Sequence, residues 1–322
     1  MLSKISRVLR VPPFLALEEE GGTVNPLQRF FPPLPQPHIA AVKGLQRVER
    51  LGSLIGEAMA LLGFNMNFAP RLDLANPNVK PSLQPQSFGP DPRTVARCGE
   101  AFVAGLLEHK VMACGMHFPG LSAADYFDSN SLPVVDKPMA ELWREDLIPF
   151  RQLLPKLGLI KLSYAAYKAY DFDLPIPASL SANVIDGLLR VKLGYRGVVV
   201  ADHFMALKEM GVAIPNDRPF IPDGGLDFNF EPFAKSVAAG CDMLMVGWGE
   251  SLIGDVAEKL KVTFNGGTLS ARRVSEAVKR IGRAKKGMRL PTGKFSKKTF
   301  DRLFREFEEF SNDCKTAERE DA

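Results

Sequence analysis

Short apolar runs alternate along the chain with longer segments of helical periodicity. The apolar runs, which predict strands, cover residues 13–17, 65–69, 111–116, 159–163, 197–201 and 241–246. The amphipathic segments, which predict helices, cover residues 46–62, 94–108, 139–154, 182–193 and 230–239. The strand runs are rich in Val, Ile, Leu and Met without polar alternation, which is typical of a parallel sheet buried on both faces. Repeated βα units of this kind predict a barrel or a doubly wound sheet.

The residues at the strand ends distinguish these two folds. Polar groups follow nearly every apolar run: Glu18, Glu20, Asp73, His117, Tyr164, Asp202 and the segment 247–250. Functional groups at the carboxyl ends of many strands are typical of a barrel, whereas a doubly wound sheet collects them at one switch point. No GxGxxG sequence opens a helix after a strand, so a dinucleotide site has no support. The sequence therefore predicts an α/β fold of the TIM-type (β/α) barrel class.

The barrel is expected to occupy residues 1–290, and residues 291–322 to form a C-terminal helix, over 294–312, with a frayed tail from 316. Only about 17 residues precede Glu18, and the apolar runs give fewer than the eight strands that close such a barrel. Three explanations stay open. The barrel is incomplete at its N-terminus, or the C-terminal helix covers the gap, or a partner chain completes it.

Composition and charge narrow the function classes. The 322 residues are 46% hydrophobic and 24% charged, as in an ordinary globular protein. The net charge of +4 is concentrated in residues 260–298, but without interleaved aromatic residues or a binding motif this run favours a solvated helix face over a nucleic-acid site. No apolar stretch approaches the roughly 20 residues of a membrane span, and the N-terminal apolar run is too short for a signal peptide. We expect a cytoplasmic protein.

The four cysteines show neither CxxC pairing nor zinc spacing, so no metal site and no cofactor are predicted. Cys114 and Cys241 lie inside apolar runs and are expected to be small core residues.

Six short motifs follow one another in order at the predicted strand ends and in the segments after them. They are residues 18–22 (EEEGG), 63–73 (GFNMNFAPRLD), 87–92 (SFGPDP), 115–120 (GMHFPG), 177–181 (PASLS) and 188–202 (LLRVKLGYRGVVVAD). In this order they resemble the motifs of glycoside hydrolase family 3, and in particular of the bacterial β-N-acetylglucosaminidases (β-N-acetylhexosaminidases). The first two resemble the family's D-Q-E-G-G and G-x-N-x-N-F-A-P-x-x-D, and the last follows its active-site signature almost throughout. The resemblance implies a barrel with retaining glycosidase chemistry and a role in carbohydrate metabolism.

A retaining glycosidase needs a carboxylate that attacks the anomeric carbon and an acid/base that protonates the leaving oxygen. The resemblance implies that Asp202 is the nucleophile. The other interpretation is that Asp202 only caps the helix that follows it.

The acid/base implied by the resemblance is a His in a D-S-H triplet after the H-F-P-G segment. Here Ser129 or Asn130 occupies that place, depending on the alignment, and neither side chain titrates near neutral pH. None of the four histidines lies in this loop. Asp125 or Asp128 is a candidate replacement, or else both are solvated loop acids.

The sugar-binding set implied by the resemblance is also altered. Its members here are Glu18, Gln86, Met116, His117, Tyr164 and Trp248. Gln86 stands where the family has Arg, and Met116 stands where it has Lys, so two charged donors are missing. His117 is either a sugar ligand or a hydrogen-bonded interior residue, and Trp248 either stacks on a sugar ring or packs in the interior.

Two hypotheses follow. In the first, the protein is a β-N-acetylglucosaminidase-like hydrolase with a degenerate active site, acting weakly or not at all on a small carbohydrate or glycoside. In the second, it is a lapsed hydrolase that binds a sugar or a protein. Fold alone does not decide between them.

Overall fold

Each predicted apolar run overlaps a strand, in several cases a shorter one than predicted, in the computed structural model, which describes residues 9–76, 86–122, 132–173, 176–202, 230–246, 250–288, 290 and 295–318. Six strands are hydrogen-bonded in the order β1-β2-β3-β5-β7-β8. Their bounds are Ala16–Leu17 (β1), Met66–Asn67 (β2), Met112–Phe118 (β3), Leu159–Leu162 (β5), Val198–Ala201 (β7) and Met243–Leu244 (β8). The pairs β1–β2, β2–β3 and β7–β8 are parallel, as predicted. A separate parallel pair, which the sequence analysis did not predict, joins β4 (Val134–Val135) to β6 (Ala166–Tyr167).

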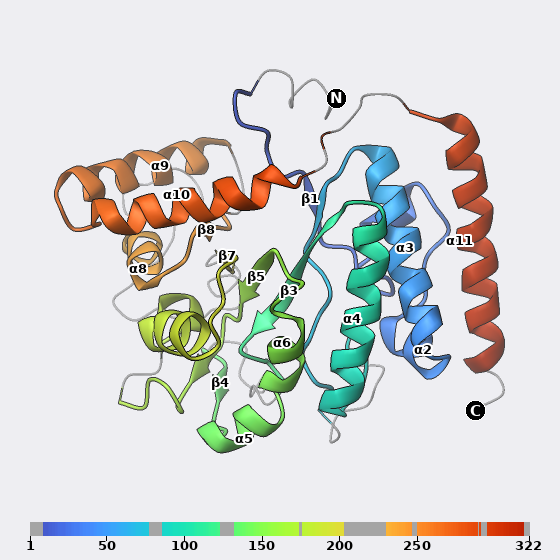
Figure 1. Ribbon diagram of the computed structural model, residues 1–322, viewed down its shortest axis with the longest axis horizontal. Helices are drawn as coiled ribbons and strands as arrows, with labels where there is room; N and C mark the ends of the chain where they lie inside the picture. Colours follow the sequence, from blue (N-terminus) through green and yellow to red (C-terminus); the bar gives the residue numbers. More distant parts are fainter. Residues whose placement is uncertain are drawn as a thin grey trace. The chain divides into compact units, whose positions relative to one another are not determined.

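Helices follow the strands in alternation (Figure 1). Their bounds are Pro37–Val42 (α2), Leu45–Leu62 (α3), Pro92–Glu108 (α4), Met139–Arg144 (α5), Leu147–Leu153 (α6), Asn183–Lys192 (η4), Glu231–Ala239 (α8), Glu250–Asn265 (α9), Ala271–Lys286 (α10) and Lys297–Glu318 (α11), with short turns at Pro26–Arg29 (η1) and Ala178–Leu180 (η3). None of the helices in the described part of the chain combines the length and the apolar character needed to cross a membrane.

Two helix predictions need correction. The segment 139–154 is not one helix, because it breaks between α5 and α6. Pro149 has no N–H to donate to the carbonyl four residues earlier, so a continuous helix would lose a hydrogen bond there. The C-terminal helix continues through Glu318 rather than fraying from residue 316.

Contacts divide the chain into two units. Unit 1 comprises Met1–His117, Glu145–Leu159 and Ala284–Ala322, and unit 2 comprises Phe118–Arg144 and Ile160–Arg283. Each unit has its own buried apolar side chains, among them Cys114 in unit 1 and Cys241 in unit 2, both with no exposed area as predicted for core residues.

In unit 1, helices α3 and α4 pack against each other at very short range. A Cβ atom on Gly52 of α3 would lie 2.3 Å from the carbonyl oxygen of Phe102, and one on Gly105 of α4 would lie 2.3 Å from that of Glu49. Both distances are shorter than the non-bonded contacts that Cβ atoms make in proteins. The absence of side chains at these two positions is therefore what lets the helix backbones meet.

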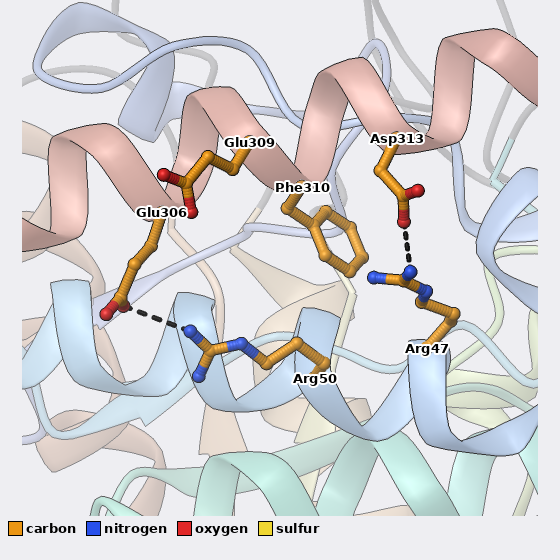
Figure 2. A pocket seen from close by; sticks show the side chains of 6 residues that line it. All are labelled: Arg47, Arg50, Glu306, Glu309, Phe310 and Asp313. Carbon is orange, nitrogen blue, oxygen red and sulfur yellow. Dashed lines mark hydrogen bonds and ion pairs between the residues drawn. The ribbon is translucent and has the colours of Figure 1, made fainter.

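The C-terminal helix α11 belongs to unit 1 and packs on α2 and α3. Its apolar face is buried through Leu303, Phe307 and Phe310, and the ring of Phe307 stacks on Phe31 with ring centres 4.7 Å apart. The polar edge carries ion pairs to α3, of Arg50 with Glu306 at 3.0 Å and of Arg47 with Asp313 (Figure 2). These contacts hold α11 against the outer surface of two other helices of its unit.

In unit 2, the buried carboxylate of Asp242 joins three elements. It lies just before β8, and its side chain has no exposed area. Its Oδ2 accepts hydrogen bonds from Arg190 Nη2 at 2.7 Å and from the backbone N of Val199 at 3.0 Å. Its Oδ1 accepts from Arg273 Nη2 at 2.6 Å and Arg280 Nη1 at 2.9 Å. One carboxylate thus ties η4, β7 and α10 to the amino end of β8.

We expect Asp242→Asn to destabilise the protein by about 3–5 kcal/mol, because it leaves buried guanidinium groups without their counter-ion. Urea unfolding followed by circular dichroism measures this. The matched control is Glu276→Gln, which removes a carboxylate that lies 3.6 Å from Arg280. The side chain of Glu276 is 36% exposed. That change should cost less than about 1 kcal/mol. Equal losses in the two variants would contradict the role given to Asp242.

Candidate active site at the strand ends

Asp202 directly follows β7 and is buried, with 8% of its surface exposed. All four residues of β7 (VVVA) are buried, so the strand fixes the start of the segment that carries the carboxylate. The Nζ atom of Lys161, from β5, lies 3.3 Å from Oδ1 of Asp202. Both residues belong to unit 2. The structure therefore places a buried ion pair at the carboxyl end of β7.

Lys161 is not among the site residues predicted from the sequence. It lies in the third position of β5 (LIKL), and it is 4% exposed. A lysine within an apolar run that is predicted to be a buried strand indicates an acidic partner nearby, because lysine is almost never buried without one.

In unit 1, the turn after β1 is held by the side chain of Glu19. Its two carboxylate oxygens accept hydrogen bonds from the backbone N of Gly21 and of Leu27, each at 2.9 Å. The side chain of Asn67 in β2 bonds both the N and the O of the Glu19 backbone, at 2.9 and 2.8 Å. Gly21 has φ of 84°, in the left-handed region that favours glycine. These contacts account physically for part of the E-G-G and N-x-N motifs.

Burial raises the pKa of Glu19 to about 8, outweighing the two backbone hydrogen bonds that act to lower it. The neighbouring Glu20 is also buried, and its Oε2 lies 3.4 Å from Nε of Arg71. Glu18, predicted to bind substrate, is half-buried just before this pair.

Asp73 and His117 form a buried pair, also in unit 1. Nδ1 of His117 lies 2.8 Å from Oδ2 of Asp73, and the backbone N of His117 donates to Oδ1 at 3.2 Å. Because a carboxylate only accepts, Nδ1 carries the proton in this contact. Burial alone would raise the pKa of Asp73, but the charge and hydrogen bonds of His117, together with Arg71, hold that pKa below its ordinary value.

The remaining predicted ligands have different surroundings. Gln86 is buried and donates from Nε2 to the carbonyl oxygen of Gly21 at 3.1 Å. Met116 lies in β3 with no exposed area, and Tyr164 is half-buried just after β5. Asp125, Asp128 and Trp248 lie outside the described residues.

Residues 2–284 match the N-terminal domain of glycosyl hydrolase family 3. The chain belongs to this family.

Similar proteins include the β-hexosaminidase of Glaesserella parasuis, which is 28% identical over 250 residues, covering 76% of this chain and 68% of that protein. A family 3 β-N-acetylglucosaminidase from a Paenibacillus species superposes with a TM-score of 0.78 at 27% identity, over 96% of this chain and 60% of that one. The β-N-acetylglucosaminidase of Thermotoga maritima gives a TM-score of 0.74 at 25% identity, over 93% of this chain and 59% of that one. The chain thus spans about three fifths of these solved chains.

Family membership and the parallel sheet together confirm the predicted α/β fold of the TIM-type barrel class. Within unit 1, the family 3 motifs bring together Glu19, Glu20, Arg71, Asp73 and His117. Within unit 2, Asp202, the last residue of the active-site signature, lies beside Lys161, which belongs to none of the family motifs. The open groove between α3 and α11, with a volume of about 300 Å³, is lined by none of these residues (Figure 2).

The raised pKa of Glu19 predicts a specific pH dependence of stability. Folded protein keeps a proton on Glu19 up to about pH 8, whereas an exposed glutamate releases it near pH 4.5. The stabilisation is therefore complete below pH 4.5 and is lost as the pH rises through 8. We expect the unfolding free energy to fall by a few kcal/mol, as an order of magnitude, between pH 5 and pH 9 through this residue.

The measurement is urea unfolding of the wild-type protein and Glu19→Gln across this pH range. The variant loses the titrating group, so the difference in unfolding free energy between the two proteins should change with pH. Glu49→Gln, on the exposed surface of α3, serves as the control. Parallel curves for the wild type and Glu19→Gln would show that Glu19 does not hold the proton.

Proposed function

We propose that this chain is a retaining β-N-acetylhexosaminidase-type protein of family 3 in which Asp202 is the nucleophile. In this proposal the usual acid/base histidine is replaced, so hydrolysis of ordinary glycosides is weak or lost. The observation that carries the proposal is the buried, ion-paired carboxylate of Asp202 at the carboxyl end of a barrel strand. That end of the strands is where barrel enzymes hold their catalytic groups.

A helix cap alone accounts poorly for the placement of Asp202. A buried carboxylate is costly unless it is paired, and here the partner is itself a buried lysine. A helix cap needs neither burial nor a charged partner. The arrangement instead keeps an ionised carboxylate in a place of low polarity, as a nucleophile requires.

The proposed chemistry differs from that of the family at the acid/base step. Ser129 or Asn130, depending on the alignment, stands in place of the histidine of the D-S-H triplet, and loss of a general acid/base costs a factor on the order of 10²–10⁴ in rate. Asp125 and Asp128 remain the candidate replacements. The names of the relatives support a terminal β-linked N-acetylhexosamine as the sugar, and this substrate is part of the proposal.

A second candidate, a sugar- or protein-binding barrel without turnover, is favoured by two observations. The Gln86 amide is engaged with the carbonyl of Gly21, and Met116 has no exposed area, so neither replaces the charged donor of the family pattern. The cytoplasmic location and the partner chain that completes the barrel stay predictions.

Activated aryl β-N-acetylglucosaminides test the nucleophile, because their leaving group departs without a proton. We expect azide to increase the release of aryl alcohol, since azide attacks the glycosyl ester of Asp202 without the help of a base. Mass spectrometry should find the β-glycosyl azide that two inversions produce. Asp202→Asn should abolish this reaction.

Asp186→Asn is the control, since Asp186 lies on the exposed surface of η4 in the same unit. Azide-dependent product that persists in Asp202→Asn would remove the nucleophile assignment. A folded wild-type protein that gives no product under any condition would favour the binding barrel.

Restoring the missing triplet tests the acid/base assignment. Asn130→His creates the sequence Asp-Ser-His at residues 128–130, and we expect it to raise azide-independent turnover by about tenfold or more. Ser129→His is the matched variant for the other alignment. If neither histidine raises the rate, the loss of the acid/base does not limit this protein.

A further inference from the structure

Lys161 is a charged residue in the interior of an apolar strand. Its neighbours in β5 are Leu159, Ile160 and Leu162, and all four residues of the strand are buried. The side chain of Lys161 is 6% exposed and that of Asp202 is 10% exposed. A lysine so placed loses most of its hydration, and the attraction of Asp202 at 3.3 Å compensates for that loss.

In the described part of the chain, neither β7 nor its neighbour β8 contains a charged residue. The residues of β7 itself are valine and alanine, and β8 is Met243–Leu244. The acidic residue beside β8 is Asp242, at the amino end of the strands, where it binds Arg190, Arg273 and Arg280. The ion pair with Lys161 thus stands apart from the arginine cluster of the same unit.

We propose that Lys161 is a positioning residue for Asp202, whose ammonium group holds this carboxylate ionised and fixes its orientation at the end of β7. The ionised form is the reactive one, and this part of the inference rests on the proposed function. In the family pattern an ammonium stands at the position of Met116. In this chain β5 contributes an ammonium within unit 2, from a position outside the family motifs.

The pairing has a consequence for the proposed reaction. When Asp202 attacks, a bond forms between its oxygen and the anomeric carbon, and the bond from that carbon to the leaving oxygen breaks. The carboxylate becomes a neutral ester, while an activated aryl oxide departs with the electron pair. Lys161 then faces an ester instead of an anion, so the pair favours the free carboxylate over the covalent intermediate. Lys161 therefore promotes release of the sugar, while its role before the attack is to orient the carboxylate.

Carboxyl-carbon NMR of protein labelled in its aspartates measures the effect directly, whether or not the protein turns over substrate. Asp202→Asn assigns the Asp202 signal. We expect the carboxyl-carbon signal of Asp202 to move in Lys161→Met, which keeps the length of the side chain and removes the charge that lies 3.3 Å from the carboxylate. Lys161→Arg, which keeps the charge, should give less than half of that change. An unchanged signal in Lys161→Met would overturn the inference.

A reciprocal measurement covers the case in which Lys161→Met does not fold. In Asp202→Asn the ammonium loses its partner, so the Cε signal of Lys161 should titrate at lower pH than in the wild-type protein. A Cε signal that titrates at the same pH in both proteins would overturn the inference equally.

Labelling by a 5-fluoro glycosyl fluoride of N-acetylglucosamine separates this inference from the proposed function. If the wild-type protein is labelled at Asp202, we expect Lys161→Met to release the label more slowly than the wild type. Release at the same rate would contradict the effect on the intermediate. If the wild type is never labelled while the NMR signals change as expected, the proposed function fails and the positioning of the carboxylate stands.

Discussion

A charged side chain inside a protein needs an opposite charge or hydrogen-bond donors around it, because it has given up its hydration. This requirement governs both ends of the strands here. At the amino end of β8, Asp242 is surrounded by Arg190, Arg273 and Arg280. At the carboxyl end of β7, Asp202 pairs with Lys161. Of the acidic groups that follow β1 and β2, Glu20 and Asp73 are likewise paired within their own unit, whereas burial raises the pKa of Glu19 to about 8 so that it keeps its proton.

The two carboxylates next to β7 illustrate how the same physical rule serves two purposes. The side chain of Asp242 is fully buried and accepts four hydrogen bonds, so it holds elements together and has no room for chemistry. Asp202 pairs with Lys161, and its side chain keeps some exposed area. In the proposed function this exposed area leaves the carboxylate reachable, as nucleophilic catalysis requires.

The charges of this chain are also distributed differently from the family pattern. The pattern has Arg and Lys at the positions of Gln86 and Met116. Here Arg71 lies beside Glu20 in unit 1, and Lys161 lies beside Asp202 in unit 2. The described part of the chain therefore has cationic groups beside strand-end acids in both units, at positions other than the two where the family pattern has Arg and Lys.

Much of the architecture was determined by the sequence alone. Apolar runs without alternation predicted the strands, because strands buried on both faces need apolar side chains at every position, and the ordered motifs predicted the family. The break between α5 and α6 depended on Pro149, a local signal that the helical periodicity concealed. Lys161 is different, because no local pattern tells which acid a buried lysine will meet. That partner lies 41 positions away in the chain, and only the pairing of strands within the folded sheet brings the ammonium of Lys161 to the carboxylate of Asp202.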